Sequence, residues 1–245
     1  MLDSVQTSTL RVAPPPLGWG LQLLGKLIHW GYRLRRKHRY DEFLLERVAG
    51  LRLLVTPSVF NPKLLRTGEF FASQLNERVI GPHSSVLDMG TGSGVCALFA
   101  ARRAARVVAV DINPAAVRCA GINALLNQLE GKVEVRHGDL FAAVPAERFD
   151  LILFNPPFLR GVPRNDRDRA WRSEDVPERF AAALAEHLNP GGCALVLLSS
   201  FGDASMFLQA FEDNGFEVSR FAERRFIAET VVIFRVRAPA TGVAA

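Results

Sequence analysis

Short apolar runs alternate with helical patterns of apolar residues from residue 85 onward. A strand that is buried on both faces has a continuous apolar run, whereas an amphipathic helix repeats apolar residues every three or four positions. The alternation predicts an α/β fold with a mostly parallel sheet that helices cover on both faces. The strand runs are 85–90, 106–111, 132–139, 149–157, 193–200, 216–226 and 230–237, and the helical patterns are 94–104, 114–128, 176–188 and 204–214.

The last two strand runs, 216–226 and 230–237, follow each other without a helix between them. Strands joined by a short turn pair antiparallel, because a parallel pair requires a long crossover connection. We therefore expect a seven-stranded, mostly parallel sheet with an antiparallel last strand. Ligand sites in such sheets lie beyond the carboxyl ends of the strands, so those loops are expected to carry the chemistry.

The chain before residue 85 has a different pattern. Residues 17–48 repeat apolar positions at helical spacing, which predicts one or two helices, and residues 1–16 contain "APPP", which predicts a loose arm. A short strand is expected at 51–55 and an amphipathic helix at 63–79. The predicted organisation is a basic helical extension at 1–50, a main domain at 51–237 and a flexible tail at 238–245.

The net charge of +5 is concentrated near the amino terminus. Residues 1–50 carry eight lysines and arginines against four acids, which accounts for +4 of the +5. The basic segment 33–39 has three interpretations: the solvated side of a helix that packs on the core, a contact with RNA phosphates, or a helix lying on an anionic membrane. Aromatic neighbours, Trp30, Tyr32 and Tyr40, favour RNA over the membrane.

A chain of 245 residues that is 49% hydrophobic can bury a full core. Its three cysteines, Cys96, Cys119 and Cys193, stand alone, so we expect neither a disulfide framework nor a zinc site, and no other metal site is predicted. The start lacks a secretory pattern, and Lys26 and His29 interrupt the most apolar stretch. We therefore expect a soluble protein of the reducing cytoplasm.

The stretch "VLDMGTGSG" links a predicted strand to a predicted helix. Glycines at Gly90, Gly92 and Gly94 let the backbone turn sharply and approach a ligand closely, and the free N–H groups at the helix start favour an anionic group. The acid Asp88 precedes them at the end of the strand. A dinucleotide-binding interpretation is also available, because Gly92, Gly94 and Ala97 satisfy G-x-G-x-x-A.

Two aspartates close the next two predicted strands. Asp111 follows the glycines by about twenty residues, a spacing at which a carboxylate can accept hydrogen bonds from the two hydroxyls of a ribose. This spacing indicates a nucleoside and does not choose between cofactors. Asp139, in "HGDL", is placed to receive an adenine amino group, although a single aspartate there is more often part of an ordinary turn.

The stretch "FNPPF" ends the apolar run 149–154. Each X-Pro link holds the preceding residue in an extended conformation, so two acceptors are preset: the side-chain oxygen of Asn155 and the backbone oxygen of Pro156, beside the ring of Phe158. Such a pair suits a planar NH₂ group, whose two hydrogens it can bind and whose nitrogen it can orient. A loop simply terminated by prolines is the structural alternative.

The ordered set "VLDMGTGSG", "AVDINP", "GDLF" and "FNPPF" resembles class I S-adenosylmethionine-dependent methyltransferases of the N-methylating NPPY/F type. The resemblance is to release-factor glutamine methyltransferases and to small-domain rRNA and adenine methyltransferases, and it covers about 51–237. It implies a Rossmann-like fold, an S-adenosylmethionine cofactor and a macromolecular substrate.

The same resemblance implies roles for individual residues. The glycines would face the methionine part of the cofactor, Asp111 the ribose and Asp139 the adenine. The implied catalytic residues are Asn155, Pro156, Pro157 and Phe158, and the implied cofactor-binding residues are Asp88, Gly90, Thr91, Gly92, Gly94, Asp111, Ile112, Asp139, Leu140 and Asn155.

The substrate is left between a protein glutamine and an exocyclic amine of a nucleobase in rRNA or DNA. Phe158 and the basic segment favour a nucleic acid, whereas "VTPSVFNP" and the retained Thr67 and Glu69 resemble the element that precedes the core in the glutamine branch. The loop 159–175 mixes five arginines with four acids, and Trp171 is its expected anchor. A nicotinamide-dependent oxidoreductase and a noncatalytic RNA-binding module are the alternative functions.

Overall fold

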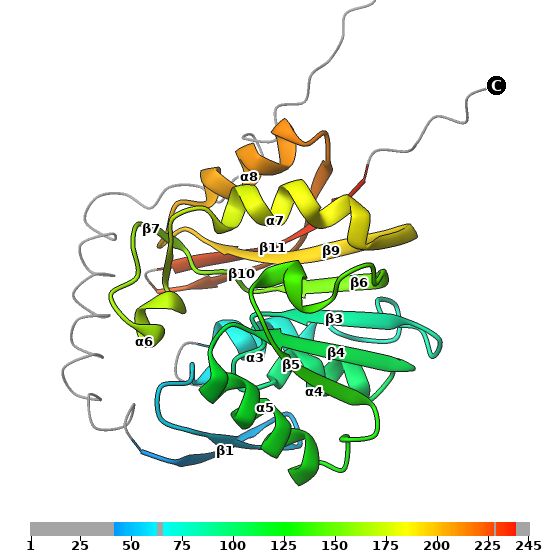
Figure 1. Cartoon of the computed structure of the whole chain (residues 1–245), viewed down its shortest axis with the longest axis vertical. Helices are drawn as coiled ribbons and strands as arrows, with labels where there is room; N and C mark the ends of the chain where they lie inside the picture. Colours follow the sequence, from blue (N-terminus) through cyan, green and yellow to red (C-terminus); the bar gives the residue numbers. More distant parts are fainter. Residues whose placement is uncertain (1–41, 63–65, 228, 239–245) are drawn as a thin grey trace, which may run out of the picture.

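The computed structural model describes residues 42–62, 66–227 and 229–238. In this part of the chain a seven-stranded sheet forms the centre, in the order β10-β11-β9-β6-β3-β4-β5 (Figure 1). β11 is antiparallel to both of its neighbours and the other adjacent pairs are parallel, which confirms the predicted fold class. The strands are β3 (Ser85–Met89), β4 (Arg106–Asp111), β5 (Val133–His137), β6 (Phe149–Phe154), β9 (Leu188–Ser199), β10 (Glu217–Phe226) and β11 (Glu229–Arg237).

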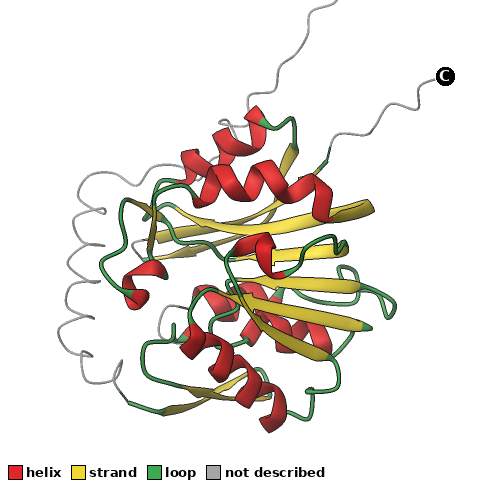
Figure 2. Cartoon of the chain, in the orientation of Figure 1, coloured by secondary structure: helices red, strands yellow, loops and turns green. Residues whose placement is uncertain are grey.

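Helices cover both faces of this sheet (Figure 2). One hydrophobic cluster joins the sheet to α3, α4 and α5, and a second joins the opposite face to η3, α7 and α8. Adjacent residues on a strand point to opposite faces, so Val86 lies in the first cluster and Leu87 in the second, and both are fully buried. The helices are α3 (Thr67–Ser73), α4 (Val95–Ala101), α5 (Pro114–Leu126), η3 (Leu140–Ala143), α7 (Val176–Leu184), η4 (Ala185–His187) and α8 (Ala204–Asp213).

The parallel strands bring distant segments to one edge of the sheet. Met89, at the end of β3, is level with Val110 of β4 and with Phe154 of β6, and Phe154 is level with Val196 of β9. The glycine turn (residues 90–94), Asp111 and residues 155–158, which we call the acceptor motif, therefore emerge at the same edge, as the sequence predicts.

The chain preceding the main sheet differs from the expectation of helices up to residue 48. Residues Leu44–Val48 form strand β1, which pairs antiparallel with β2 (Leu51–Val55). The turn between them has positive φ at Ala49 and Gly50, 42° and 87°, which is the backbone that two-residue hairpins require. Helical periodicity over residues 44–48 was therefore misleading, and the expected strand at 51–55 is confirmed.

Two asparagines on α5 attach this hairpin to the rest of the fold. Asn123 accepts from the Leu54 N–H at 2.7 Å and donates to the Leu54 carbonyl at 2.9 Å. Asn127, one helical turn later, does the same for Arg52, at 3.0 and 2.7 Å. Their side-chain amides thus occupy the outer edge of β2 as a neighbouring strand would. Asn123 also donates to the Ser93 carbonyl at 2.9 Å, which ties the hairpin to the glycine turn.

The helix expected at 63–79 is shorter in its described part, where α3 ends at Ser73. Asn76 accounts for the end of the helical pattern, because its side chain accepts from the Arg78 N–H and its carbonyl accepts from the N–H groups of Val79 and Ile80. The expectations for residues 1–41, including the basic segment 33–39, and for 239–245 lie outside the described residues. No helix of the described ranges is long and apolar enough to cross a membrane.

Candidate active site

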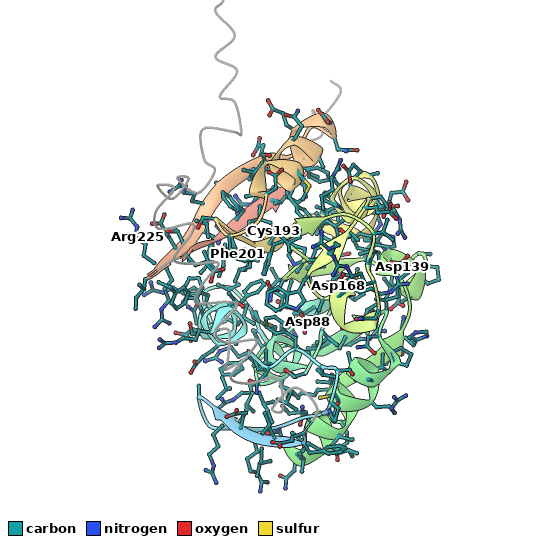
Figure 3. The ribbon with its side chains drawn as sticks, turned by 90° about the vertical axis from the view of Figure 1, so that its left-hand side faces the viewer. Asp88, Asp139, Asp168, Cys193, Phe201 and Arg225 are labelled. Atoms are coloured by element: carbon teal, nitrogen blue, oxygen red, sulfur yellow. The ribbon has the colours of Figure 1, made fainter. Side chains whose placement is uncertain are left out.

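A cleft of about 260 Å³ lies at the carboxyl ends of β3, β4 and β6. This volume is near the lower end of small-molecule sites, roughly 300 to 1,000 Å³. Figure 3 shows the side of the molecule on which Asp88 and Asp139 lie. The sequence-predicted residues that line the cleft are Asp88, Gly90, Thr91, Gly92, Asp111, Ile112, Asp139, Leu140, Asn155, Pro156, Pro157 and Phe158.

The glycines of the β3–α4 turn have two different roles. Gly90, Gly92 and Gly94 all have positive φ, at 64°, 56° and 83°, which other residues rarely adopt. A Cβ at Gly92 would meet nothing within 4 Å, so the backbone there is open to the cleft. A Cβ at Gly94 would lie 3.1 Å from the Ala120 Cβ, so Gly94 allows α4 and α5 to pack closely and is not among the residues that line the cleft.

Asp88 holds the glycine turn from inside. Its Oδ2 accepts from the Thr91 hydroxyl at 2.6 Å and from the Ala97 N–H at 2.9 Å, so one carboxylate joins the strand end to the first turn of α4. The residue is only 4% exposed, and this burial raises the pKa of Asp88 to about 7, against the lowering effect of the two hydrogen bonds. Near neutral pH the side chain is therefore divided between its charged and neutral forms.

Asp111 connects the end of β4 to the same turn. Its Oδ2 accepts from the Gly92 N–H at 2.8 Å, and its Oδ1 accepts from the Asn113 N–H at 2.9 Å. Burial raises the pKa of this carboxyl above its ordinary value, and the backbone hydrogen bonds act in the opposite direction. Each oxygen keeps a further lone pair for a ligand hydroxyl. The neighbouring Ile112 also lines the cleft and is 38% exposed, so it offers an apolar wall beside the carboxylate.

Asp139 lies in the cleft with a partner that the sequence did not indicate. Its Oδ2 is 2.6 Å from Nη2 of Arg179, on α7, and the arginine also lies 3.6 Å from the Asp175 carboxylate. The next residue, Leu140, has φ of 48° and also lines the cleft. Arg179 itself is a lining residue, so its ion pair with Asp139 forms part of the cleft wall. In the sequence, Arg179 occupies a polar position of an amphipathic helical pattern, as a solvated arginine does. The pattern therefore gave no sign that Arg179 lines the cleft.

The acceptor motif contains an unsatisfied polar atom. The side-chain oxygen of Asn155 is buried and has no hydrogen-bond partner among the described residues, although Asn155 lines the cleft. Leaving a buried acceptor unpaired costs about 1 to 3 kcal/mol. Native structures rarely keep such a group unpaired. Because Asn155 lines the cleft, a ligand that donates a hydrogen bond to its oxygen explains the unpaired acceptor.

Phe158 is fixed by aromatic neighbours and by its own backbone. Its ring contacts Trp171 with centroids 6.2 Å apart, and Trp171 contacts Phe60 at 5.5 Å, which confirms Trp171 as the anchor of the loop 159–175. That loop contains β7 (Leu159–Arg160), α6 (Asp166–Arg169) and β8 (Arg172–Ser173). The carbonyl of Phe158 accepts from the Asp203 N–H at 3.1 Å, so the loop after β9 also reaches the motif.

Comparisons with known proteins agree with this geometry. The family model described as "Methyltransferase small domain" matches residues 50–220. A release factor glutamine methyltransferase of Cereibacter sphaeroides is 32% identical over 201 residues, and a putative protein N5-glutamine methyltransferase of Methanocaldococcus jannaschii is 28% identical over 199 residues. The alignments cover 76% and 78% of this chain, and they span 62% of the first relative and 97% of the second.

A solved structure of a T. thermophilus 16S rRNA methyltransferase in complex with AdoMet and guanosine is also similar. Its TM-score is 0.58 with 25% sequence identity, over 80% of this chain and 50% of that one. The similar proteins therefore include enzymes named for a protein substrate and an enzyme named for RNA.

Proposed function

The chain belongs to the methyltransferase small domain family, and from this membership we propose that it transfers a methyl group from S-adenosylmethionine to a planar amide or amine nitrogen. The observation that carries the proposal is the buried, unpartnered oxygen of Asn155 in a cleft that also contains the glycine turn. A substrate amino group supplies the hydrogen that this oxygen lacks. Membership of this family favours the methyltransferase over the nicotinamide-dependent alternative.

The residues of the cleft fit the cofactor. The open backbone at Gly92 accommodates the methionine part, and the free lone pairs of Asp111 accept from the ribose hydroxyls. Ile112 and Leu140 offer apolar contact to the adenine, near Asp139. When bound, S-adenosylmethionine supplies a methyl group on a positively charged sulfur.

The protein contributes orientation and electrostatics to the reaction. The lone pair of an amide or nucleobase nitrogen is delocalised, so such a nitrogen is a weak nucleophile. Acceptance of its hydrogens by the Asn155 oxygen and the Pro156 carbonyl orients the nitrogen and stabilises the positive charge that develops on it as the N–C bond forms. Correct positioning of two reactants can contribute roughly 7 to 11 kcal/mol. Bound S-adenosylmethionine would supply the methyl carbon and keep the electrons of the broken carbon–sulfur bond on its sulfur, and the excess proton on the acceptor nitrogen would pass to water.

The acceptor belongs to a macromolecule, either a protein glutamine or a nucleobase amine. The relatives named for release factors support the first, and the solved rRNA methyltransferase supports the second. The enzyme is expected to act in the cytoplasm, because its three cysteines are free and suit a reducing compartment.

The test is cofactor binding followed by methyl transfer. Calorimetry with S-adenosylmethionine and with NADH is expected to give binding of the first only, and binding of NADH alone would refute the proposal. Incubation with radiolabelled S-adenosylmethionine and a cell lysate is expected to label a macromolecule. Division of the labelled sample between protease and ribonuclease then identifies the substrate class.

A further inference from the structure

The turn of the β10–β11 hairpin lies close to the acceptor motif. Thr230, at the start of β11, exchanges two hydrogen bonds with Ser200: its N–H donates to the serine hydroxyl at 2.9 Å, and its carbonyl accepts from the serine N–H at 2.8 Å. Ser200 begins the short loop that carries Gly202, which packs directly on Phe158. Figure 3 shows Arg225 at the outer end of this hairpin, with Phe201 between it and Asp88 in this view.

Arginines and phenylalanines gather at this turn. The guanidinium carbons of Arg66 and Arg224 lie 5.8 and 5.4 Å from the ring centroid of Phe226, and Arg224 also lies 5.9 Å from that of Phe70. The Arg225 side chain is 75% exposed. Arg225 pairs with Glu223 on the opposite face of β10, because adjacent strand residues alternate between faces. We call Arg66, Phe70, Arg224 and Phe226 the hairpin-tip patch.

The patch holds positive charge that the protein does not neutralise. In the described ranges neither Arg66 nor Arg224 forms an ion pair, although both lie over the same ring. Arg225, on the opposite face of β10, has a partner in Glu223, so the unpaired charge belongs to Arg66 and Arg224. A guanidinium stacked on a ring still presents N–H donors at its edge, and these donors match the oxygens of a phosphate.

Arg66 links the patch to the cleft wall along the chain. Arg66 precedes α3 directly and has φ of 58°, a conformation that non-glycine residues rarely adopt. Gly68, two residues later, lines the cleft and packs on Pro62, where an added Cβ would lie 2.8 Å from the Pro62 Cβ. Arg66 is thus held at a fixed position between the hairpin and the cleft wall.

We propose that the hairpin-tip patch binds the phosphodiester backbone of an RNA whose target base enters the cleft. Unneutralised arginines suit a polyanion, and RNA provides one phosphate per nucleotide. The aromatic rings of Phe60 and Phe158 at the cleft offer faces on which an unstacked base can lie, as single-stranded RNA recognition requires. This inference rests on the proposed methyl transfer and assigns its substrate to nucleic acid.

The test measures RNA binding separately from methyl transfer. The probe is a fluorescent single-stranded RNA oligonucleotide of mixed sequence, titrated with the full chain over a series of salt concentrations. For the double variant Arg66→Gln and Arg224→Gln we expect affinity at low salt to fall at least tenfold. The salt dependence of log K is expected to become shallower by roughly 0.7 for each phosphate that the variant no longer neutralises.

Arg102→Gln is the matched control. Arg102 also stacks on a ring, with its guanidinium carbon 5.9 Å from the Phe99 centroid, but it lies at the carboxyl end of α4 and not in the patch. It is expected to bind RNA like the wild type. Arg224→Glu, which reverses one charge of the patch, is a second patch variant, and it is expected to weaken binding in the same direction.

RNA affinity and salt dependence that are the same in the wild type and in both patch variants would overturn the inference. Polyglutamate that displaces the fluorescent RNA as well as unlabelled RNA does would also overturn the inference, in favour of an acidic protein partner. Calorimetric binding of S-adenosylmethionine keeps the two proposals apart. If the protein binds RNA through the patch but does not bind the cofactor, only the proposed function is refuted. If methyl transfer is the same in the wild type and in the patch variants, only this inference is refuted.

Discussion

A methyl group placed on Gly202 would lie 2.3 Å from the carbonyl oxygen of Phe158 and 2.4 Å from its Cβ. No real Cβ approaches other heavy atoms so closely, so the loop after β9 and the acceptor motif are seated directly on each other. The hydrogen bond from the Asp203 N–H to the same carbonyl, at 3.1 Å, completes this contact. The position of Phe158 therefore depends on a glycine more than forty residues away in the sequence.

Gly202→Ala should lower turnover while leaving affinity for S-adenosylmethionine unchanged. The added methyl must displace Phe158 or the loop, and a misplacement of about 1 Å can cost on the order of 10²-fold in rate. Steady-state kinetics and calorimetry measure the two quantities. Gly121→Ala is the control, because a Cβ at Gly121 on α5 meets nothing within 4 Å. Normal turnover in the Gly202 variant would show that the contact does not position the acceptor motif.

Asn155→Ala should reduce kcat by roughly 10²- to 10³-fold, as removal of one preorganised polar group does in other enzymes. Cofactor affinity should survive, because the Asn155 oxygen is assigned to the acceptor nitrogen. Asn189→Ala provides the comparison, since Asn189 donates to Asp150 at 2.7 Å, near the start of β9 and away from the cleft. Single-turnover rates and cofactor titrations would be compared, and equal losses in both variants would contradict the assigned role.

Asp111→Asn should weaken binding of S-adenosylmethionine by roughly 10- to 100-fold, the range given by loss of one hydrogen bond to a charged group, about 1.5 to 3 kcal/mol. The carboxylate accepts a backbone N–H at each oxygen, and an amide nitrogen cannot replace either acceptor. Calorimetric titration at constant pH measures the effect. An unchanged dissociation constant would remove Asp111 from the cofactor site.

Asp88 should make the protein less stable as pH rises toward neutrality. Its pKa is about 7 in the folded protein against an ordinary 3.8, so between these values the folded chain holds a proton that the unfolded chain has released. The free energy of unfolding then falls by about 1.4 kcal/mol per pH unit from this group, and the decline stops above pH 7.

Urea unfolding of the wild type and of Asp88→Asn between pH 4 and 8 checks this dependence. The asparagine has no carboxyl to titrate, and its oxygen can still accept from Thr91 and Ala97. The variant is expected to gain stability relative to the wild type as pH rises, up to about 7. Parallel stability curves for the two proteins would contradict a raised pKa at Asp88.

The sequence was sufficient for the central sheet and for part of the lining of the cleft. Parallel strands with both faces buried give long apolar runs, and their carboxyl ends meet at one edge, so Asp111 and Asn155 could be brought together without coordinates. The β1–β2 hairpin was missed in part because its leading strand, Leu44–Val48, also fits helical spacing.

Contacts between distant segments had no sequence signal. The pairing of Arg179 with Asp139 joins α7 to the loop after β5, and the seating of Gly202 on Phe158 joins two loops. Gly94 looked like its two neighbours in the turn, and only the close approach of Ala120 distinguishes it as a packing residue. Such relationships depend on distances between elements, which periodicity and spacing do not contain.

The two asparagines on α5 cover a strand edge that could otherwise pair with another copy of the chain. β1 and β2 form a separate two-stranded sheet, and a bare strand margin readily recruits the strand of another molecule. Asn123 and Asn127 occupy the N–H and C=O groups of Leu54 and Arg52 that would otherwise be available for such recruitment. Their loss would therefore leave a strand edge through which copies of the chain can pair.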